Sequence, residues 1–192
     1  MRLINPDQLL DVRRGAKYLL GCIIKRQLPD GTTLEGRIVE TESYHQEDPA
    51  SHTFNGESVR NTAMFGPPGF AYIYFTYGVH WCFNVTAGEK GYGAGILIRG
   101  VEPLNGLHTM ETLRKTTATT QLTNGPAKFA QAFAIDKSLY GHNLTQPPLQ
   151  IFEASSRNFN TVETTRIGIS KAVDEIARFY IADNNFVSKL RV

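Results

Sequence analysis

The chain has 192 residues, of which 41% are hydrophobic and 20% are charged. This length favours one domain over residues 1–192, and the composition excludes a disordered or fibrous protein. The 20 Lys and Arg residues outnumber the 18 Asp and Glu residues by only two, too small an excess to indicate nucleic-acid binding. We expect no membrane partner, because no hydrophobic run reaches the ~18 residues of a membrane span and the N-terminus lacks a signal-peptide pattern.

The N-terminal segment has the pattern of a helix. Asn5 is a typical N-cap residue, Pro6 suits the first helical position, and Gly21 is typical of a helix end. Between them, hydrophobic residues recur at helical spacing, at Leu9, Val12, Ala16 and Leu19. We therefore predict one helix that ends at Gly21.

Two extended runs follow, over residues 22–28 and 33–44, with a Pro-Asp-Gly turn between them. Because alternate side chains of a strand share a face, Glu40, Glu42 and Tyr44 point the same way. Two carboxylates on a half-hydrophobic strand are unfavourable unless they are solvated, paired or used in chemistry. Glu42 is therefore either part of a solvated strand end or a catalytic base.

The middle of the chain combines a long loop with an aromatic hairpin. Residues 45–68 lack periodicity, and a loop of this length in a compact domain is typically functional. Residues 70–85 are rich in aromatic side chains and predict a β-hairpin with its tip at 76–80. Tyr74 and Tyr77 are consistent with sheet packing. At a hairpin tip, however, Tyr77 finds little protein to pack against, and exposed aromatic residues stack on nucleic-acid bases or wedge between them.

The second half of the chain alternates strands and helices. A strand over 94–99 would end at Arg99, which the following Gly100 leaves unshielded. Helical patterns cover 105–115 and begin again at 124–128, extended patterns cover 149–153 and 165–170, and 172–181 fits a helix or an edge strand. Hairpins mixed with separate helices favour an α+β fold in a single mixed domain.

The sequence indicates neither a metal nor a cofactor. Its five histidines have no metal-ligand spacing, and Cys22 and Cys82 follow none either, so we expect both cysteines to be reduced and buried. Motifs for a nucleophilic serine or a nucleotide cofactor are missing. Residues 125–128 open a helix whose N–H groups and Lys128 ammonium suit a phosphate, although a well-formed helix start explains them equally well.

Several segments together resemble the alkyladenine (3-methyladenine) DNA glycosylase family. They occur in the family's order over nearly the whole chain: 36–44, 48–52, 60–65, 68–69, 72–78 with Asn84, 97–104 and 125–128. The resemblance implies one mixed α/β domain around a curved antiparallel sheet, with flanking helices and the predicted hairpin protruding from it. It also implies removal of damaged purines from DNA after they are flipped out.

The resemblance also assigns roles to individual residues. Glu42 would be the general base that activates water, and Arg99 would help to hold that water or the nearby backbone. The flipped base would be lined by Tyr44, His52 and Tyr74, while Asn84 would clash with the 2-amino group of normal guanine. Tyr77 would enter the minor groove and fill the gap left by the flipped nucleotide, and Lys128 would contact a phosphate.

The implied enzyme is a monofunctional, monomeric DNA glycosylase of base excision repair. It would hydrolyse the N-glycosidic bond of 3-methyladenine, 7-methylguanine or hypoxanthine in double-stranded DNA. We expect a cytoplasmic, nucleoid-associated protein if the source is bacterial and a nuclear one if it is eukaryotic. Two alternatives are a non-catalytic nucleic-acid-binding module and a hydrolase of free nucleosides, which would not need an exposed Tyr77.

Overall fold

A computed structural model describes residues 1–76 and 78–188 of the protein. Tyr77, the predicted wedge residue, lies outside the described residues. The described part contains α1 (Val12–Leu19), α2 (Leu107–Arg114), α3 (Pro126–Ala132) and four short 3₁₀ helices, η1 (Pro6–Leu9), η2 (Thr62–Phe65), η3 (Thr119–Gln121) and η4 (Lys137–Leu139). Its strands are β1 (Ile23–Gln27), β2 (Thr33–Tyr44), β3 (Ala71–Thr76), β4 (His80–Thr86), β5 (Gly95–Asn105), β6 (Leu149–Phe152), β7 (Thr161–Thr165) and β8 (Ile176–Ile181).

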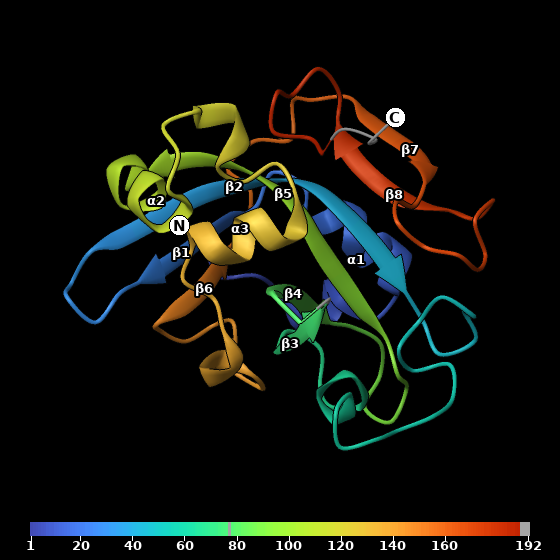
Figure 1. Ribbon diagram of the computed structural model, residues 1–192. Helices are drawn as coiled ribbons and strands as arrows, with labels where there is room; N and C mark the ends of the chain where they lie inside the picture. The colour runs from blue at the N-terminus through green and yellow to red at the C-terminus, as the bar shows by residue number, and fades with distance from the viewer. Residues whose placement is uncertain (77, 189–192) are drawn as a thin grey trace.

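The strands form one antiparallel sheet, which confirms the predicted α+β class. Their order is β3-β4-β5-β2-β1-β6, and the β7–β8 hairpin joins this sheet through the pairing of β8 with β2. Figure 1 shows the two longest strands, β2 and β5, side by side across the molecule, with α2 and α3 together on one side of them. Every strand pairing among residues 1–76 and 78–188 is antiparallel.

The N-terminal segment forms two helices instead of the single predicted one. Asn5 does cap the first, since its side chain accepts a hydrogen bond from the Asp7 N–H at 3.1 Å. Asp11 then adopts an extended backbone and accepts from the Arg14 N–H at 2.8 Å. A second N-cap at this position satisfies the free N–H groups of a new helix, so the chain restarts at Val12.

Strand β2 borders different strands along its two halves. Its first half pairs with β1 and the segment Glu40–Glu42 pairs with β8, while β5 runs along its other edge. Glu42 is thereby opposite Leu97 on one side and Arg178 on the other. This arrangement surrounds the two carboxylates of β2 with neighbours from distant parts of the sequence.

Two of the predicted strands have different bounds. The strand predicted to stop at Arg99 continues to Asn105, so Arg99 lies inside β5 and is only 7% exposed. The strand predicted over 165–170 is wrong, because β7 ends at Thr165 and the Ile167 N–H donates to the Glu42 side chain instead of a neighbouring strand. Of the two alternatives for 172–181, the strand is correct, but β8 lies between β2 and β7 and is not an edge.

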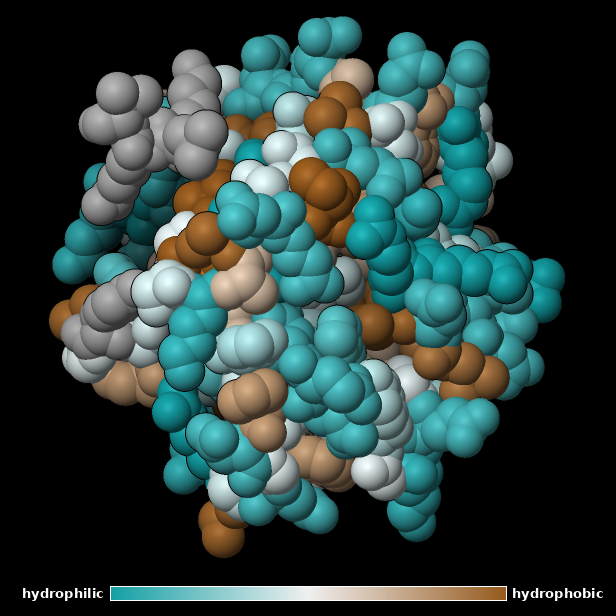
Figure 2. Space-filling model, turned by 90° about the vertical axis from the view of Figure 1, so that its right-hand side faces the viewer, coloured by the Kyte–Doolittle hydropathy of each residue, from teal (hydrophilic) through white to brown (hydrophobic). Residues whose placement is uncertain are grey.

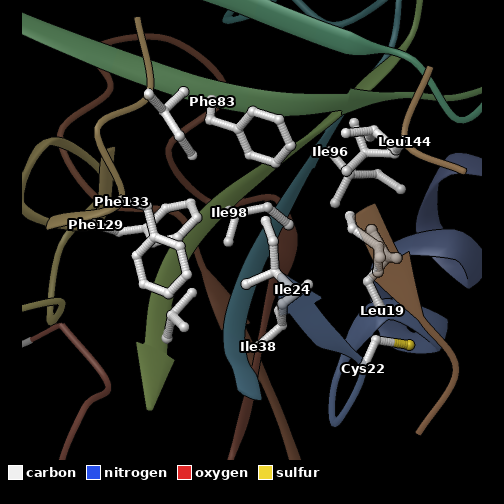
Figure 3. Packing of buried hydrophobic residues seen from close by; sticks show 14 of the residues in the cluster. Leu19, Cys22, Ile24, Ile38, Phe83, Ile96, Ile98, Phe129, Phe133 and Leu144 are labelled. Carbon is white, nitrogen blue, oxygen red and sulfur yellow. The ribbon is translucent and has the colours of Figure 1, made fainter. Parts of the chain in front are cut away.

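The core lies between the sheet and the helices. Figure 3 shows Phe129 of α3 and Phe133, which directly follows α3, beside Phe83 of β4 and Ile98 of β5. The rings of Phe129 and Phe83 are 6.1 Å apart at their centres. Cys22 and Cys82 are buried, as predicted. Figure 2 shows a face on which hydrophobic side chains lie singly or in small groups among hydrophilic ones. Within the described ranges, no helix is long and apolar enough to cross a membrane.

Candidate active site

A cavity of about 910 Å³ opens beside the ends of β2 and β3 and reaches the N-terminal end of α3. Side chains from several segments that are far apart in the sequence line it, which explains why no single motif defines the site. Six of the residues selected from the sequence contribute to its wall: Tyr44, His52, Tyr74, Asn84, Arg99 and Lys128. The fold therefore brings the predicted substrate-binding residues together.

Aromatic rings form one wall of this cavity. Tyr72 and Tyr74 are two residues apart on β3 and face the same side, with ring centres 5.6 Å apart and planes 28° apart. The His52 ring meets Tyr74 edge-on at 4.5 Å, and its Nδ1 is 2.8 Å from the Tyr72 hydroxyl. The sequence analysis did not assign Tyr72 to the site, although its period-two relation to Tyr74 is visible in the sequence.

These rings are electrically neutral at ordinary pH. Burial is the main cause that raises the pKa of both Tyr72 and Tyr74, so neither hydroxyl ionises near neutrality. His52 keeps exposed surface at the cavity mouth, but the packed rings remove part of its hydration and Arg60 adds a positive charge, and both effects lower its pKa. Neutral, electron-rich faces suit a flat aromatic ring, and they attract one that carries positive charge.

Glu42 lies directly behind the cavity wall. Its side chain has no exposed surface, so the alternative of a solvated strand end is wrong. Oε2 accepts hydrogen bonds from the Tyr44 hydroxyl at 2.8 Å and from Arg99 Nη1 at 3.1 Å, and Oε1 accepts from the Ile167 N–H at 2.9 Å. Tyr44, Arg99 and Ile167 all line the cavity.

The hydrogen-bond capacity of Glu42 is not exhausted by these partners. A carboxylate has about four lone-pair positions, and three protein donors occupy three of them. One position thus remains for a further donor. The same contacts raise the pKa of Tyr44, chiefly through burial and then through the negative charge of Glu42.

Arg99 is held between two carboxylates. Its Nη1 contacts Glu42 and its Nε is 3.3 Å from Oε1 of Glu40. Burial acts to lower the pKa of Arg99, but Glu42 and then Glu40 outweigh it, so the pKa is raised and the guanidinium stays charged. The cavity floor therefore carries an ion-paired cation.

Asn84 and Lys128 line other parts of the cavity. Asn84 is 5% exposed and donates from Nδ2 to the Tyr72 carbonyl at 3.2 Å, which fixes the orientation of its amide. Lys128 lies in α3, where its Nζ donates to Gln121 at 2.6 Å and to Asn124 at 2.7 Å. These contacts hold the ammonium at the wall of the cavity.

The residues on either side of Tyr77 form the predicted hairpin. Thr76 of β3 pairs with His80 of β4, and Gly78 has a φ of 67°, the left-handed conformation that glycine adopts without strain. Val79 is 65% exposed and also lines the cavity. The hairpin thus ends in solvent at the rim of the cavity.

Sequence reasoning missed the charged partners that surround the site. Glu40 pairs with Arg178 of β8 as well as with Arg99, and Arg166 pairs with Asp48 of the long loop. The only signal in the sequence is the spacing of Glu40 and Glu42, for which pairing is one of three alternatives, beside solvation and use in chemistry. No group of three or more His, Cys, Asp or Glu residues suited to a metal ion occurs in residues 1–76 and 78–188.

Most of the chain is similar to a set of known proteins. A sequence model described as methylpurine-DNA glycosylase matches residues 8–185. A protein named "Putative 3-methyladenine DNA glycosylase" from Carboxydothermus hydrogenoformans is 46% identical over 93% of this chain and 94% of its own length. Proteins of the same name from Methanoculleus marisnigri and Salinibacter ruber are 42% and 43% identical, over 91% and 90% of this chain and 92% and 89% of their own lengths. The chain belongs to the methylpurine-DNA glycosylase family, and it is accordingly a DNA glycosylase, a DNA-repair hydrolase whose substrate is damaged DNA.

Proposed function

We propose that residues 1–192 form one monofunctional DNA glycosylase domain that acts as a monomer on double-stranded DNA. It would release alkylated or deaminated purines of the 3-methyladenine, 7-methylguanine and hypoxanthine class and leave an abasic site. The observation that carries this proposal is the position of Glu42. Its carboxylate lies immediately behind a cavity with aromatic walls and keeps room for one more hydrogen-bond donor.

The target base has to leave the duplex to reach the cavity. Flipping costs a few kcal/mol, and the cost is lower for a damaged or mispaired base. Tyr77 at the hairpin tip would fill the gap in the stack, and Lys128 would contact the backbone phosphates. Inside the cavity, the rings of Tyr44, His52 and Tyr74 would stack on the base. Asn84, fixed by the Tyr72 carbonyl, would obstruct a guanine 2-amino group.

Hydrolysis would proceed through a water molecule between Glu42 and the sugar. The carboxylate takes a proton from the water while the water oxygen bonds to C1′, and the electron pair of the C1′–N bond leaves with the base. A methylated, positively charged base accepts that pair without prior protonation, and neutral hypoxanthine needs a proton as well. Glu42 and the Tyr44 hydroxyl also supply negative charge and polarity where the sugar becomes positive.

A chromatographic assay of released bases tests this proposal. The purified protein is incubated with an alkylated duplex and, separately, with free methylated nucleosides. We expect base release from the duplex alone, and we expect no strand cleavage and no borohydride-trapped adduct, because water and not a lysine attacks. Release from free nucleosides would indicate a nucleoside hydrolase, and tight binding without release would indicate a binding module.

The Glu42→Gln variant tests the mechanism within the same assay. We expect it to bind damaged duplex but to lose base release by at least ~10²-fold, the lower end of a general-base contribution. Glu89→Gln makes the same chemical change at an exposed surface position and is expected to retain full release. Undiminished release by Glu42→Gln would contradict the assigned role of the carboxylate.

A further inference from the structure

Arg99 lies between two carboxylates, and only one of these carboxylates lies next to the cavity. Its Nη1 donates to Glu42 at 3.1 Å, while its Nε lies 3.3 Å from Glu40 and its Nη2 lies 3.4 Å from the Ser188 hydroxyl. Each of the three nitrogens of the guanidinium thus has a partner. Glu42 receives a single N–H from Arg99 and not the two parallel bonds of a bidentate pair.

Glu40 is itself fixed from several directions. Its carboxylate accepts from Arg178 Nε at 2.6 Å, and from the backbone N–H and the hydroxyl of Ser188, both at 2.7 Å. Arg178 Nη2 in turn donates to the Ser188 carbonyl at 3.2 Å. Glu40 has no exposed surface, and Arg178 and Ser188 are 6% and 7% exposed. Ser188 therefore closes a buried cluster that begins on β2.

The cluster is balanced in charge. Glu40 and Glu42 carry two negative charges, and Arg99 and Arg178 carry two positive ones. Buried charges interact more strongly than exposed ones and are poorly screened by salt, so removing one member changes the field at the others. Without the charge of Glu40, both cations would face Glu42 alone, and Arg99 would be free to approach it with two N–H groups.

We infer that Glu40, held by Arg178 and Ser188, is a positioning residue that draws the Arg99 guanidinium away from bidentate pairing with Glu42 and so keeps Glu42 available to a water molecule. This inference rests on the proposed role of Glu42 as the base. It assigns a function to a strand residue and to the C-terminal segment, neither of which lines the base cavity.

The titratable and charged groups around Glu42 come from every element packed against it. β2 supplies Glu40 and Tyr44, β5 supplies Arg99, and β8 supplies Arg178. Tyr74 of β3 and Cys82 of β4 are near Glu42 and Arg99, respectively, and Arg166 lies over the Tyr44 ring. Substitution of Glu40 removes none of these other groups, so a changed pH profile reports the lost carboxylate and its effect on Arg99.

Single-turnover base release from an alkylated duplex, followed across pH, tests the inference. For Glu40→Gln we expect the plateau rate of base release to be about 10-fold lower than that of the original protein. This loss is smaller than the ~10²-fold or more expected for Glu42→Gln. We also expect the acidic limb of the pH profile to move to lower pH, because the loss of one carboxylate leaves an excess of positive charge in the buried cluster. An unmoved acidic limb in folded Glu40→Gln would overturn the inference.

A charge-neutral double variant separates electrostatics from structural damage. Glu40→Gln combined with Arg178→Gln leaves Glu42 and Arg99 as a balanced pair, so the acidic limb is expected to return most of the way to its original position. If Glu40 had a purely structural role, the double variant would release base more slowly than Glu40→Gln does. Its pH profile would then be no closer to that of the original protein. That result would also overturn the inference.

Ser188→Ala serves if Glu40→Gln does not fold. It removes one hydrogen bond to Glu40 and the acceptor of Arg99 Nη2 but leaves the Ser188 backbone N–H in place. We expect release to slow about 5-fold, the value of one hydrogen bond of ~1 kcal/mol, with unchanged DNA binding. An unchanged release rate would count against the inference.

Glu42→Gln in the same experiment separates the role of Glu42 from the role of Glu40. If Glu42→Gln releases base at the original rate, the proposed base is wrong. If Glu42→Gln loses release while the acidic limb of folded Glu40→Gln stays in place, only the role of Glu40 is wrong.

Discussion

The guanidinium of Arg166 lies 4.6 Å from the centre of the Tyr44 ring, and its side chain has no exposed surface. It pairs with both oxygens of Asp48 and donates to the Ser43 carbonyl at 3.1 Å. Burial alone would lower the pKa of Arg166, but its bonds to Asp48 outweigh burial and raise it. One buried cation thus connects the long loop to the strand end that carries Tyr44.

We expect Asp48→Ala to destabilise the protein by about 3–5 kcal/mol, because it leaves the Arg166 charge buried without its main partner. Glu175→Ala is the matched control, since Glu175 is a partly exposed second partner of Arg166 at 3.0 Å. Glu175→Ala should lower the free energy of unfolding by no more than about 1 kcal/mol. Urea unfolding curves measure both values. Equal losses would show that the buried pair with Asp48 stabilises the protein no more than the partly exposed pair with Glu175.

The sequence predicted the parts of the site that depend on local periodicity. The common face of Glu40, Glu42 and Tyr44 follows from alternation along one strand, and the hairpin of β3 and β4 follows from its aromatic run and glycine tip. The cavity wall contains the residues that these patterns selected. Its assembly from several distant segments depends on strand order, which no local pattern encodes.

The burial of Arg99 could not be predicted, for a physical reason. A strand end next to a glycine predicts an unshielded arginine, but Gly100 is the place where the chain packs tightly, with the Phe186 carbonyl 2.6 Å from where a Cβ would lie. The C-terminal segment thus covers β5 at this point. Pairings such as that of Glu40 with Arg178, 138 residues apart, have no signature in either segment.

Stability should depend on pH through His52. Burial and then Arg60 lower its pKa from the ordinary value of 6.5, so the folded protein binds this proton less readily than the unfolded chain does. The free energy of unfolding therefore falls as the pH drops below about 6.5 and levels off below the folded-state pKa.

We expect His52→Asn to remove this part of the slope in urea unfolding measured between about pH 7.5 and 5. His108→Asn is the control, because the His108 side chain on α2 is 96% exposed, and its substitution should leave the slope unchanged. If His52→Asn retains the original slope, another group is responsible for it.

Lys128 should contribute to the salt dependence of DNA binding. Its ammonium is held at the cavity wall by Gln121 and Asn124, at a position suited to a backbone phosphate. A protein releases about 0.9 counterion for each phosphate that it neutralises on duplex DNA. We expect Lys128→Ala to weaken binding for all sequences and to reduce the slope of log K against log salt by about one.

Lys137→Ala removes an equal charge from an exposed position that does not line the cavity. We expect it to leave the slope at its original value. Fluorescence anisotropy with a damaged duplex at several salt concentrations measures both variants. The same slope for Lys128→Ala and Lys137→Ala would remove the phosphate contact from the proposal.

Tyr77 should matter for duplex substrates and much less for single strands. Gly78 and Val79, which follow it in the chain, are both exposed. A base in a duplex must leave its stack, whereas a base in a single strand has no partner to lose. We expect Tyr77→Ala to slow release from duplex by about 10-fold or more, since one aromatic stack contributes about 1–3 kcal/mol. As a control, Phe54→Ala removes an exposed ring that lies outside the cavity wall, and it should leave the ratio of duplex to single-strand rates unchanged. Equal slowing of both substrates by Tyr77→Ala would mean that this ring acts on the released base or the fold and does not replace the flipped nucleotide.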